Sequence, residues 1–307
     1  MELLAPGCSF DFSANTAVAL GSFDGLHIGH KAIINDVIRY AKSSETMSVV
    51  YTFKDHPSYS LGDRIQLITP LEIKVELLEN MGVDCLCLED FTPSFMAITP
   101  KEFVDEILGK RFNARYVSAG FNYRFGHGGQ GDAQLLKRLC EERGIVCEIH
   151  GAVTIDGHTV SSTAIREFIG EGNMDEARQY LGRDYFIRGD VTRGRAMGKL
   201  LGFPTANILP PPDMAIPGNG VYLTMVEIQG KKLPSLTNVG TAPTFSCMNK
   251  VIETHIINYK EDLYGRELRV YFLKRLRYER KFGSPAELRL QLARDMETAI
   301  GYFNHKY

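Results

Sequence analysis

No run of about 18 apolar residues occurs in this 307-residue sequence, and only six cysteines are present. Without such a run, no transmembrane helix is expected. Residues 1–11 also lack the basic start and long apolar stretch of a signal peptide, so we expect a cytoplasmic chain. Because no paired CxxC indicates zinc and six cysteines are too few for a disulfide scaffold, we expect reduced core thiols.

The sequence also lacks an excess of charge of either sign. Lys and Arg total 35 and Asp and Glu total 37, which gives a net charge of −2. Without a global basic field, a dedicated nucleic-acid binder is disfavoured, and no membrane partner is expected. The balanced charge is compatible with a small phosphate-bearing ligand, because a few local groups can bind it. Self-association is possible as well, since the sequence does not define an oligomeric state.

Short apolar runs alternate with helical patterns through the first half of the chain. This alternation predicts an α/β fold with a Rossmann-like, doubly wound parallel sheet. Ligands of such sheets bind at the carboxyl ends of the strands, so the loops after the strands are the candidate site. The predicted strands are 16–21, 47–53, 83–88, 116–120 and 146–150, and the predicted helices are 30–43, 70–81, 100–112 and 132–143.

The pattern changes near residue 182. A short helix over 173–181 can end at Gly182, and five β-like runs separated by Gly and Pro clusters follow, which predicts a small antiparallel barrel. A last helix closes the chain, with Ser284 as its N-cap and Glu287 completing a capping box. At roughly 100–200 residues per domain, the length fits two domains. The predicted boundaries are 1–184 and 185–307.

The strongest chemical signal is GSFDGLHIGH, residues 21–30, which follows a strand and opens a helix. His27 and His30 are spaced i, i+3, so one helical turn places them on the same face. Gly25 and Gly29 allow close approach of a ligand to the backbone, and a helix start favours phosphate. Two imidazoles can then donate hydrogen bonds to phosphate oxygens during a transfer reaction. The alternatives are a zinc site or two capping histidines.

A second motif, SSTAIR, comes near the end of the first half. The HxGH spacing resembles the signature of adenylyl-transferring nucleotidyltransferases, which use a second motif at this place. Hydroxyls of Ser161, Ser162 and Thr163 at a helix start can bind phosphate oxygens, and Arg166 can clamp a pyrophosphate. Alone, this segment would be a helix N-cap; together with HxGH, the functional interpretation is favoured.

Between these motifs, Gly126, Gly128 and Gly131 match GxGxxG. A dinucleotide-binding fingerprint follows the first strand of a βαβ unit, whereas this one comes late in the domain. We therefore interpret 119–132 as a flexible ligand loop rather than an NAD site.

A second cluster of candidate site residues lies in the second half. Thr205 and Asn207 are two residues apart, so an extended segment presents both on one side, where a hydroxyl and an amide oxygen suit Mg²⁺. Glu253 lies on a predicted strand with His255 on the same face, and a carboxylate in a barrel mouth could take a proton from a substrate hydroxyl. In isolation each would be a turn or surface residue.

Taken together, these motifs resemble the bacterial bifunctional riboflavin kinase/FAD synthetase family over essentially the whole chain. The resemblance implies an N-terminal nucleotidyltransferase that moves AMP from ATP onto FMN, and a C-terminal six-stranded barrel kinase that phosphorylates riboflavin with ATP. The matching stretches are GSFDGLHIGH, YTFKDHP, QLITPLEIK, AGFNYRFGHGGQGD, VSSTAIR, YLGRDYFIRGDV, GKLLGFPTANI, GVYLTMV, NVGTAPTF, IETHIINY, LYGRELRVYFLKRLR and KFGSPAELRLQLARD.

The resemblance also implies residue roles. His27, His30 and Arg166 would stabilise phosphates, Thr205 and Asn207 would hold Mg²⁺, and Glu253 would be the base. The ligands would be riboflavin, FMN, FAD and ATP. The implied nucleotide- or flavin-contacting residues are Gly21, Phe23, Gly25, Gly29, Asn122, Ser161, Ser162, Thr163, Gly198, Gly202 and Pro204.

Two positions depart from the family pattern. Ser22 stands where the family usually has Asn, and Asn122 stands where it often has Asp. Both lie in the first half, so a riboflavin kinase with a weakened adenylyltransferase half is the alternative function. A non-enzymatic flavin- or nucleotide-binding regulator is disfavoured, because pure binding needs no base beside a metal site, and an oxidoreductase built on GxGxxG is least favoured.

Overall fold

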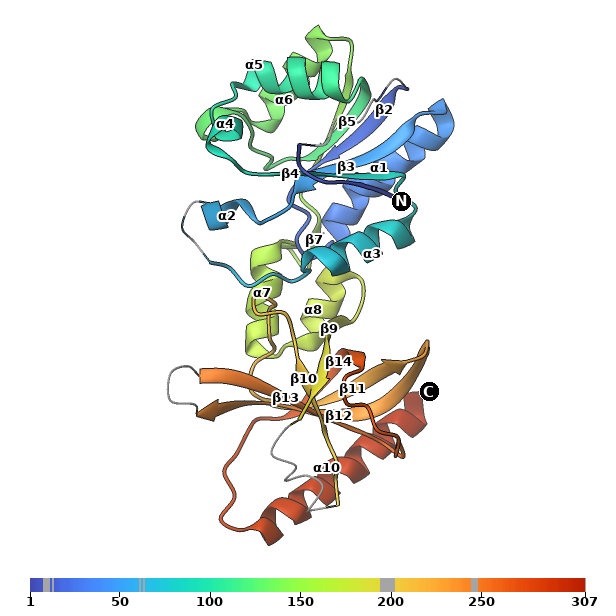
Figure 1. Cartoon of the computed structure of the whole chain (residues 1–307), viewed down its shortest axis with the longest axis vertical. Helices are drawn as coiled ribbons and strands as arrows, with labels where there is room; N and C mark the ends of the chain where they lie inside the picture. Colours follow the sequence, from blue (N-terminus) through green and yellow to red (C-terminus); the bar gives the residue numbers. More distant parts are fainter. Residues whose placement is uncertain are drawn as a thin grey trace. The chain divides into compact units, whose positions relative to one another are not determined.

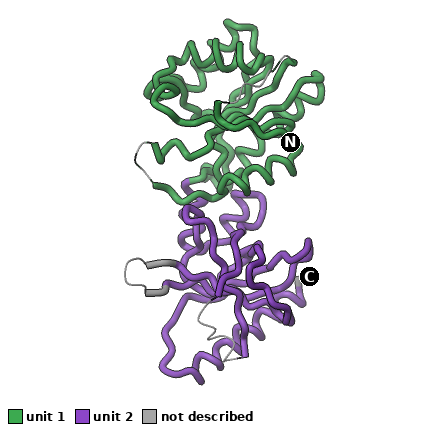
Figure 2. The backbone as a smooth tube through the Cα atoms, viewed as in Figure 1, with its two compact units in different colours: residues 1–162 green, residues 163–307 purple. Residues whose placement is uncertain are grey.

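The computed structural model describes residues 1–7, 12, 14–60, 62, 64–193, 202–243 and 248–306, without the side chains at 242, 243, 248, 249 and 306. The chain divides into two compact units, unit 1 (residues 1–162) and unit 2 (residues 163–307), shown in Figure 2. The domain boundary predicted from the sequence pattern, between 184 and 185, remains a prediction about independent folding, which a pair of fragments can test.

Unit 1 is built on a six-stranded sheet in the order β1-β4-β3-β2-β5-β6 (Figure 1). Every pairing in it is parallel, which confirms the doubly wound sheet. The three-residue strand β1 was not predicted, because it is too short for a periodic pattern. The strands are β1 (Glu2–Leu4), β2 (Thr16–Leu20), β3 (Met47–Phe53), β4 (Cys85–Glu89), β5 (Ala114–Gly120) and β6 (Val146–His150).

Helices cover both faces of this sheet. On one face, α1 (Ile28–Ser44) and α3 (Leu71–Met81) pack their apolar sides against β2, β3 and β4. On the other face lie α6 (Ala133–Glu142) and the π-helix η1 (Phe103–Arg111). The remaining short helices of unit 1 are α2 (Pro57–Ser60), α4 (Pro93–Met96), α5 (Pro100–Glu102) and the 3₁₀-turn η2 (His127–Gly129), and a two-stranded ribbon pairs β7 (Thr154–Ile155) with β8 (His158–Thr159).

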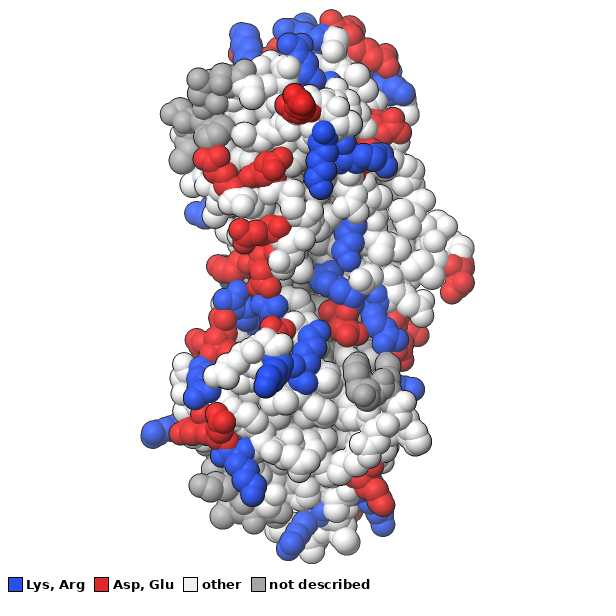
Figure 3. All heavy atoms as spheres, turned by 90° about the vertical axis from the view of Figure 1, so that its right-hand side faces the viewer, with Lys and Arg blue, Asp and Glu red and all other residues white. Residues whose placement is uncertain are grey.

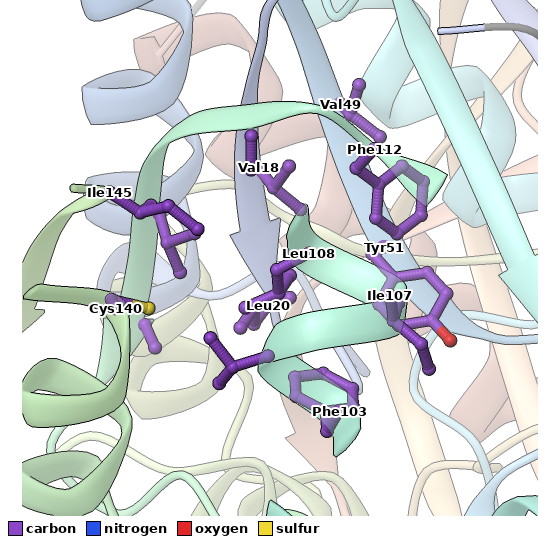
Figure 4. Close-up of a cluster of buried hydrophobic side chains, with 14 of the residues drawn as sticks. Val18, Leu20, Val49, Tyr51, Phe103, Ile107, Leu108, Phe112, Cys140 and Ile145 are labelled. Atoms are coloured by element: carbon purple, nitrogen blue, oxygen red, sulfur yellow. The ribbon is translucent and has the colours of Figure 1, made fainter. Parts of the chain in front are cut away.

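The segment 100–112 is helical as predicted, but most of it is not an α-helix. Three residues of α5 lead directly into the π-helix. Its apolar residues Phe103, Ile107, Leu108 and Phe112 are spaced i, i+4, i+5 and i+9. This spacing is longer than the 3.6 residues per turn of an α-helix, and the wider turn of a π-helix places these residues on one face. Figure 4 shows these side chains in the core beside Val18 and other residues of the sheet.

Unit 2 contains a closed barrel of six strands in the order β10-β13-β12-β11-β14-β9, all antiparallel. This confirms the six-stranded barrel that the family resemblance implied. The sixth strand, β10, comes from the segment that carries Asn207. The strands are β9 (Tyr185–Thr192), β10 (Ala206–Leu209), β11 (Gly220–Ile228), β12 (Lys231–Pro243), β13 (Met248–Ile256) and β14 (Glu267–Arg277).

The two faces of the barrel wall are easily told apart. On the outer face, Val221, Leu223 and Met225 of β11 pack with residues of α10 (Pro285–Lys306), the C-terminal helix. The alternating inward positions include Thr224 and Thr237, which are fully buried and hydrogen-bonded to each other at 2.8 Å. Alternation along β11 and β12 therefore separates inward-facing from outward-facing residues.

Two helices precede the barrel, α7 (Ser162–Glu171), which belongs to unit 2 from its second residue on, and α8 (Met174–Leu181). The Gly218 N–H donates to the Ile169 carbonyl oxygen at 3.0 Å, which joins α7 to the loop before β11. Gly172 between the helices has φ +76°, and a Cβ there would lie 2.3 Å from the Tyr222 hydroxyl, so only glycine fits. Gly182 ends α8 in the left-handed conformation, as predicted.

The predicted cap of the last helix is half right. Ser284 Oγ accepts the Glu287 N–H at 3.2 Å, as an N-cap does. The Glu287 carboxylate, however, accepts the Gly283 N–H at 3.0 Å instead of the Ser284 N–H, so the capping box is wrong.

Two further expectations concern membranes and cysteines. Within the described ranges, no helix is long and apolar enough to cross a membrane. Four cysteines are buried free thiols, as expected for core residues, while Cys8 and Cys247 lie outside the described residues. The buried four are Cys85, Cys87, Cys140 and Cys147.

Candidate functional site

The strand order of unit 1 reverses at the boundary between β2 and β5. From β2 the chain proceeds through β3 to β4 on one side, and from β5 it proceeds to β6 on the other. Ligands of open α/β sheets bind at such a reversal, outside the carboxyl ends of the strands. The loop after β2 holds GSFDGLHIGH and the loop after β5 holds Asn122, so both motifs face this position.

His27 and His30 lie together at the start of α1. His27 is the N-cap of the helix, and its Nδ1 accepts the His30 N–H at 3.2 Å. The two rings stack with centroids 3.6 Å apart and an interplanar angle of 17°. Because Nδ1 of His27 is an acceptor, the ring proton lies on Nε2, so capping and phosphate contact are compatible roles. The part of the chain that the structure describes contains no cluster of three metal-ligating side chains.

The His30 imidazole is held neutral. Burial lowers its pKa well below the ordinary value, and the neighbouring His27 and Lys74 lower it further. Its Nδ1 is enclosed and has no hydrogen-bond partner among the described residues. The Phe23 ring meets the His30 ring edge-on at 5.3 Å. A buried polar atom without a partner is uncommon in a folded protein, and together with the lowered pKa it marks His30 as a candidate functional residue.

Asp24 fastens this loop to the segment before α3. Its carboxylate accepts the N–H groups of Ile68 and Thr69, each at 3.0 Å, and the Gly25 N–H donates to Thr69 Oγ1 at 2.8 Å. The loop has positive φ at Phe23, Gly25 and Leu26. Such strained backbone persists where surrounding contacts hold it, commonly at functional sites.

Ser162 brings the start of the second motif to the first. Its hydroxyl donates to the Asp24 carbonyl oxygen at 2.8 Å, across 138 residues of sequence. Ser161 is half-buried and Thr163 is exposed. Arg166 lies one turn further along α7, within unit 2. Ser162 therefore joins the start of the second motif to the loop of the first.

Asn122 follows β5 and is exposed, with its Oδ1 packed over Gly120. The glycines that follow do not open an α-helix: Gly126 precedes the 3₁₀-turn η2, unlike a dinucleotide-binding fingerprint. A Cβ on Gly126 would lie 2.7 Å from Pro100, and one on Gly131 would lie 2.5 Å from Phe125. Close packing therefore explains why Gly126 and Gly131 are glycines, without a bound ligand.

A pocket lies beside the first motif, on the side of β3 and α3. It combines apolar side chains with three basic groups, Lys54, His56 and Lys74, and two carboxylates, Asp24 and Asp55. The lining residues are Ser22, Asp24, Phe53, Lys54, Asp55, His56, Pro57, Leu67, Thr69, Leu71 and Lys74.

In unit 2, Glu253 lies between two asparagines. On β13 it is the direct partner of Asn207 on β10 and of Asn238 on β12. Directly opposed residues of antiparallel strands point to the same face, so the three polar side chains form a row. Thr205 immediately precedes β10. The expected neighbourhood of Asn207 and Glu253 is therefore present.

The row lies on the outer face of the barrel wall, which corrects the expectation of a carboxylate in the barrel mouth. Ile252 and Thr254, which flank Glu253, are buried, and Thr254 bonds to Thr237 inside the barrel at 2.9 Å. Strand alternation then places Glu253 outside, together with His255.

His255 holds the segment before β10. A hydrogen bond of 2.7 Å joins its Nδ1 to the Pro204 carbonyl oxygen, and its ring meets Phe203 edge-on at 5.8 Å. Gly202 has φ +88°, where glycine is favoured. Gly198, another predicted contact, lies outside the described residues.

Two residues at these sites were not singled out from the sequence. Lys74 lies in the matched stretch QLITPLEIK, and its position on the inward side of α3, next to Ile73, was the available signal. Asn238 lies in NVGTAPTF, and nothing local distinguishes it from other strand asparagines.

Basic and acidic side chains are interspersed on the face of the molecule drawn in Figure 3, consistent with the balanced composition. No broad field of one sign is visible on that face.

Comparison with known proteins agrees with this geometry. The FAD synthetase family profile matches residues 10–164, and the riboflavin kinase profile matches residues 181–303. A Bacillus subtilis protein named bifunctional riboflavin kinase/FMN adenylyltransferase is 33% identical, covering 95% of this chain and 94% of the relative. The chain belongs to the bifunctional riboflavin kinase/FMN adenylyltransferase family.

Other similar proteins extend the comparison. An Escherichia coli K12 protein of the same name is 32% identical, covering 93% of this chain and 92% of its own. A crystal structure named as a macrolide-efflux protein from Streptococcus pneumoniae has a TM-score of 0.87 at 33% identity and covers 94% of both chains. The latter name describes that protein; the likeness here is one of fold. The family resemblance, the two enzyme modules and the fold class are thereby confirmed.

Proposed function

We propose that unit 1 transfers AMP from ATP to FMN at the start of α1. The observation that carries this proposal is the meeting of three elements at the reversal of the sheet: the stacked pair His27 and His30, the N–H groups of the helix start, and Ser162 of the second motif. In the reaction, an oxygen of the FMN phosphate bonds to the α-phosphorus of ATP while the bond from that phosphorus to the bridging oxygen breaks. Pyrophosphate leaves with the electron pair.

The residues of unit 1 act by positioning and charge stabilisation. Gly21, Phe23, Gly25 and Gly29 shape the loop against the triphosphate, and Asn122 contacts the nucleotide or flavin. We assign the flavin to the pocket beside β3, whose wall combines apolar side chains with three basic groups and the two carboxylates of Asp24 and Asp55. The residues proposed for the pyrophosphate are Ser161, Ser162, Thr163 and Arg166.

We propose that unit 2 phosphorylates riboflavin on its 5′-hydroxyl. Glu253 takes the hydroxyl proton as the oxygen attacks the γ-phosphorus of ATP, and ADP leaves. Thr205 and Asn207 offer the oxygen ligands that Mg²⁺ prefers, and Glu253 stands beside Asn207, so the donor set fits. When bound, Mg²⁺ would neutralise phosphate charge; the proposed nucleotide contacts around it are Gly198, Gly202 and Pro204.

The test uses the purified full chain. Riboflavin, ATP and MgCl₂ should give FMN and then FAD with one pyrophosphate per FAD, separated by liquid chromatography. Omitting Mg²⁺ with excess EDTA should stop both steps. FMN that accumulates without FAD would support the weakened adenylyltransferase, and no flavin product would support a binding protein.

We also propose a cytoplasmic enzyme whose ligands are riboflavin, FMN, FAD and ATP, acting without nucleic acid or membrane. Buried free thiols and balanced charge support this. Sedimentation at enzyme concentrations will show whether the chain self-associates.

A further inference from the structure

Lys74 is a buried lysine in the first turn of α3, with 8% of its surface exposed. Lysine is rarely buried unless its ammonium is paired. Its position follows from tertiary contacts, because the hydrogen bonds from Ile68 and Thr69 to Asp24 hold the start of α3 against the first motif. Lys74 is thereby held next to the nucleotide-binding loop.

The ammonium of Lys74 is only partly satisfied. Its Nζ donates to the Ser22 carbonyl oxygen at 2.9 Å, and among the described residues no carboxylate forms an ion pair with it. An ammonium has three N–H donors, so two remain for another acceptor. Burial lowers the pKa of Lys74 to about 8, against the opposing effect of the Asp24 charge. Such a desolvated cation gains most from an anionic ligand.

The surroundings indicate which anion this is. Lys74 is close enough to His30 to lower the pKa of that ring, and it also lines the pocket that contains Lys54 and His56 beside the carboxylates of Asp24 and Asp55. It therefore stands where the pocket meets the proposed triphosphate site. A ligand with an apolar ring system and a phosphate matches a wall that also contains Phe53 and other apolar side chains.

We propose that Lys74 binds the phosphate of the FMN acceptor and holds it beside the α-phosphate of ATP. The inference rests on the proposed function of unit 1. Two anionic phosphates must approach to bonding distance, and a cation on the acceptor side offsets their repulsion. Lys74 keeps its proton throughout: the acceptor oxygen bonds to the α-phosphorus, and pyrophosphate leaves.

A purely structural role as the counter-ion of Asp24 is the competing explanation. The Asp24 carboxylate already accepts three hydrogen bonds, from the Ile68 and Thr69 N–H groups and from the Thr69 hydroxyl. Loss of a structural counter-ion would lower the melting temperature without altering the KM for FMN, whereas loss of a phosphate contact alters that KM.

The experiment compares Lys74→Met with wild type in the full chain. Hydrogen bonds to charged groups contribute about 1.5–3 kcal/mol, so the KM for FMN in FAD formation should rise about 10- to 150-fold. The KM for ATP should change by less than about threefold, and riboflavin phosphorylation should be unchanged. Lys42→Met, at an exposed lysine in the last turn of α1, is the matched control and should resemble wild type.

Several outcomes would overturn the inference. One is a rise in the KM for ATP as large as the rise in the KM for FMN. Another is an unchanged KM for FMN, whether or not the melting temperature falls. If Lys74→Met does not fold, Lys74→Arg and Lys74→Gln replace it: the arginine variant should retain a lower KM for FMN than the glutamine variant, and equal values would refute the proposal. If wild type forms no FAD, the proposed function fails instead.

Discussion

Asn207 and Glu253 are direct cross-strand partners on the outer face of the unit 2 barrel, and Asn238 stands opposite Glu253 on its other side. An asparagine amide offers two N–H donors that a neighbouring carboxylate can accept. Such neighbours can fix the carboxylate's direction while leaving it able to accept a proton. This arrangement, and not burial in the barrel, supports the proposal that Glu253 is the base.

The first prediction concerns Glu253→Gln. This change keeps size and hydrogen bonding but removes basicity, so kinase turnover should fall about 10²–10⁴-fold. FAD formation from supplied FMN should be unaffected. Turnover and melting temperature should be measured together, with Glu267→Gln, at an exposed position of β14, as the control. A lower melting temperature with near-normal turnover would make Glu253 a structural residue.

The second prediction concerns catalysis by His30. If its ring contacts the transferring phosphate, His30→Ala should reduce FMN-to-FAD conversion about 10²–10³-fold, the scale of one lost donor. Riboflavin phosphorylation should barely change. Equal loss of both activities would contradict the assignment of the two reactions to separate sites.

The third prediction concerns pH and uses the same residue. The folded-state pKa of His30 lies well below that of the unfolded chain, about 6.5. Between these values the unfolded chain binds more protons, so the free energy of unfolding of unit 1 should rise with pH and fall on acidification below about 6.5. His30→Gln should flatten this slope in urea titrations between pH 5 and 7, and an unchanged slope would show that other groups cause it.

The fourth prediction concerns fragments. Residues 185–307 should fold and phosphorylate riboflavin, because a complete barrel and α10 remain. Residues 163–307 should melt higher, since α8 packs on β9 and β14 and buries Leu181, and one such side chain contributes about 1.5–3 kcal/mol. Equal melting temperatures would show that α7 and α8 add nothing to the barrel.

The fifth prediction concerns the attachment of α10. Arg277 on β14 donates to both carboxylate oxygens of Asp295, at 2.8 to 3.1 Å, and Asp295 is 3% exposed. Asp295→Ala leaves a partly buried guanidinium without its partner, which typically costs about 3–5 kcal/mol. The exposed Glu297→Ala should cost less than about 0.5 kcal/mol. Urea unfolding of 163–307 measures both, and similar values would refute the prediction.

Local pattern was sufficient for much of this protein. Alternating short apolar runs and 3.6-residue periodicity define strands and helices within a few residues, because both depend on neighbours in the chain. The spacing of His27 and His30 likewise determines that one helical turn presents both. The order of the matched motifs, from GSFDGLHIGH to KFGSPAELRLQLARD, was sufficient to identify the family.

Tertiary structure decided what those elements face. Periodicity shows that Lys74 lies on the inward side of its helix. It does not show that the Lys74 ammonium donates a hydrogen bond to the carbonyl oxygen of Ser22, 52 residues away. Likewise, strand alternation puts Glu253 opposite in direction to Thr254, but only closure of the barrel and the position of α10 show which side is outside. The physical reason is the same in both cases: sequence spacing specifies which side chains share a face, whereas the partner across that face comes from a distant part of the chain and is chosen by packing.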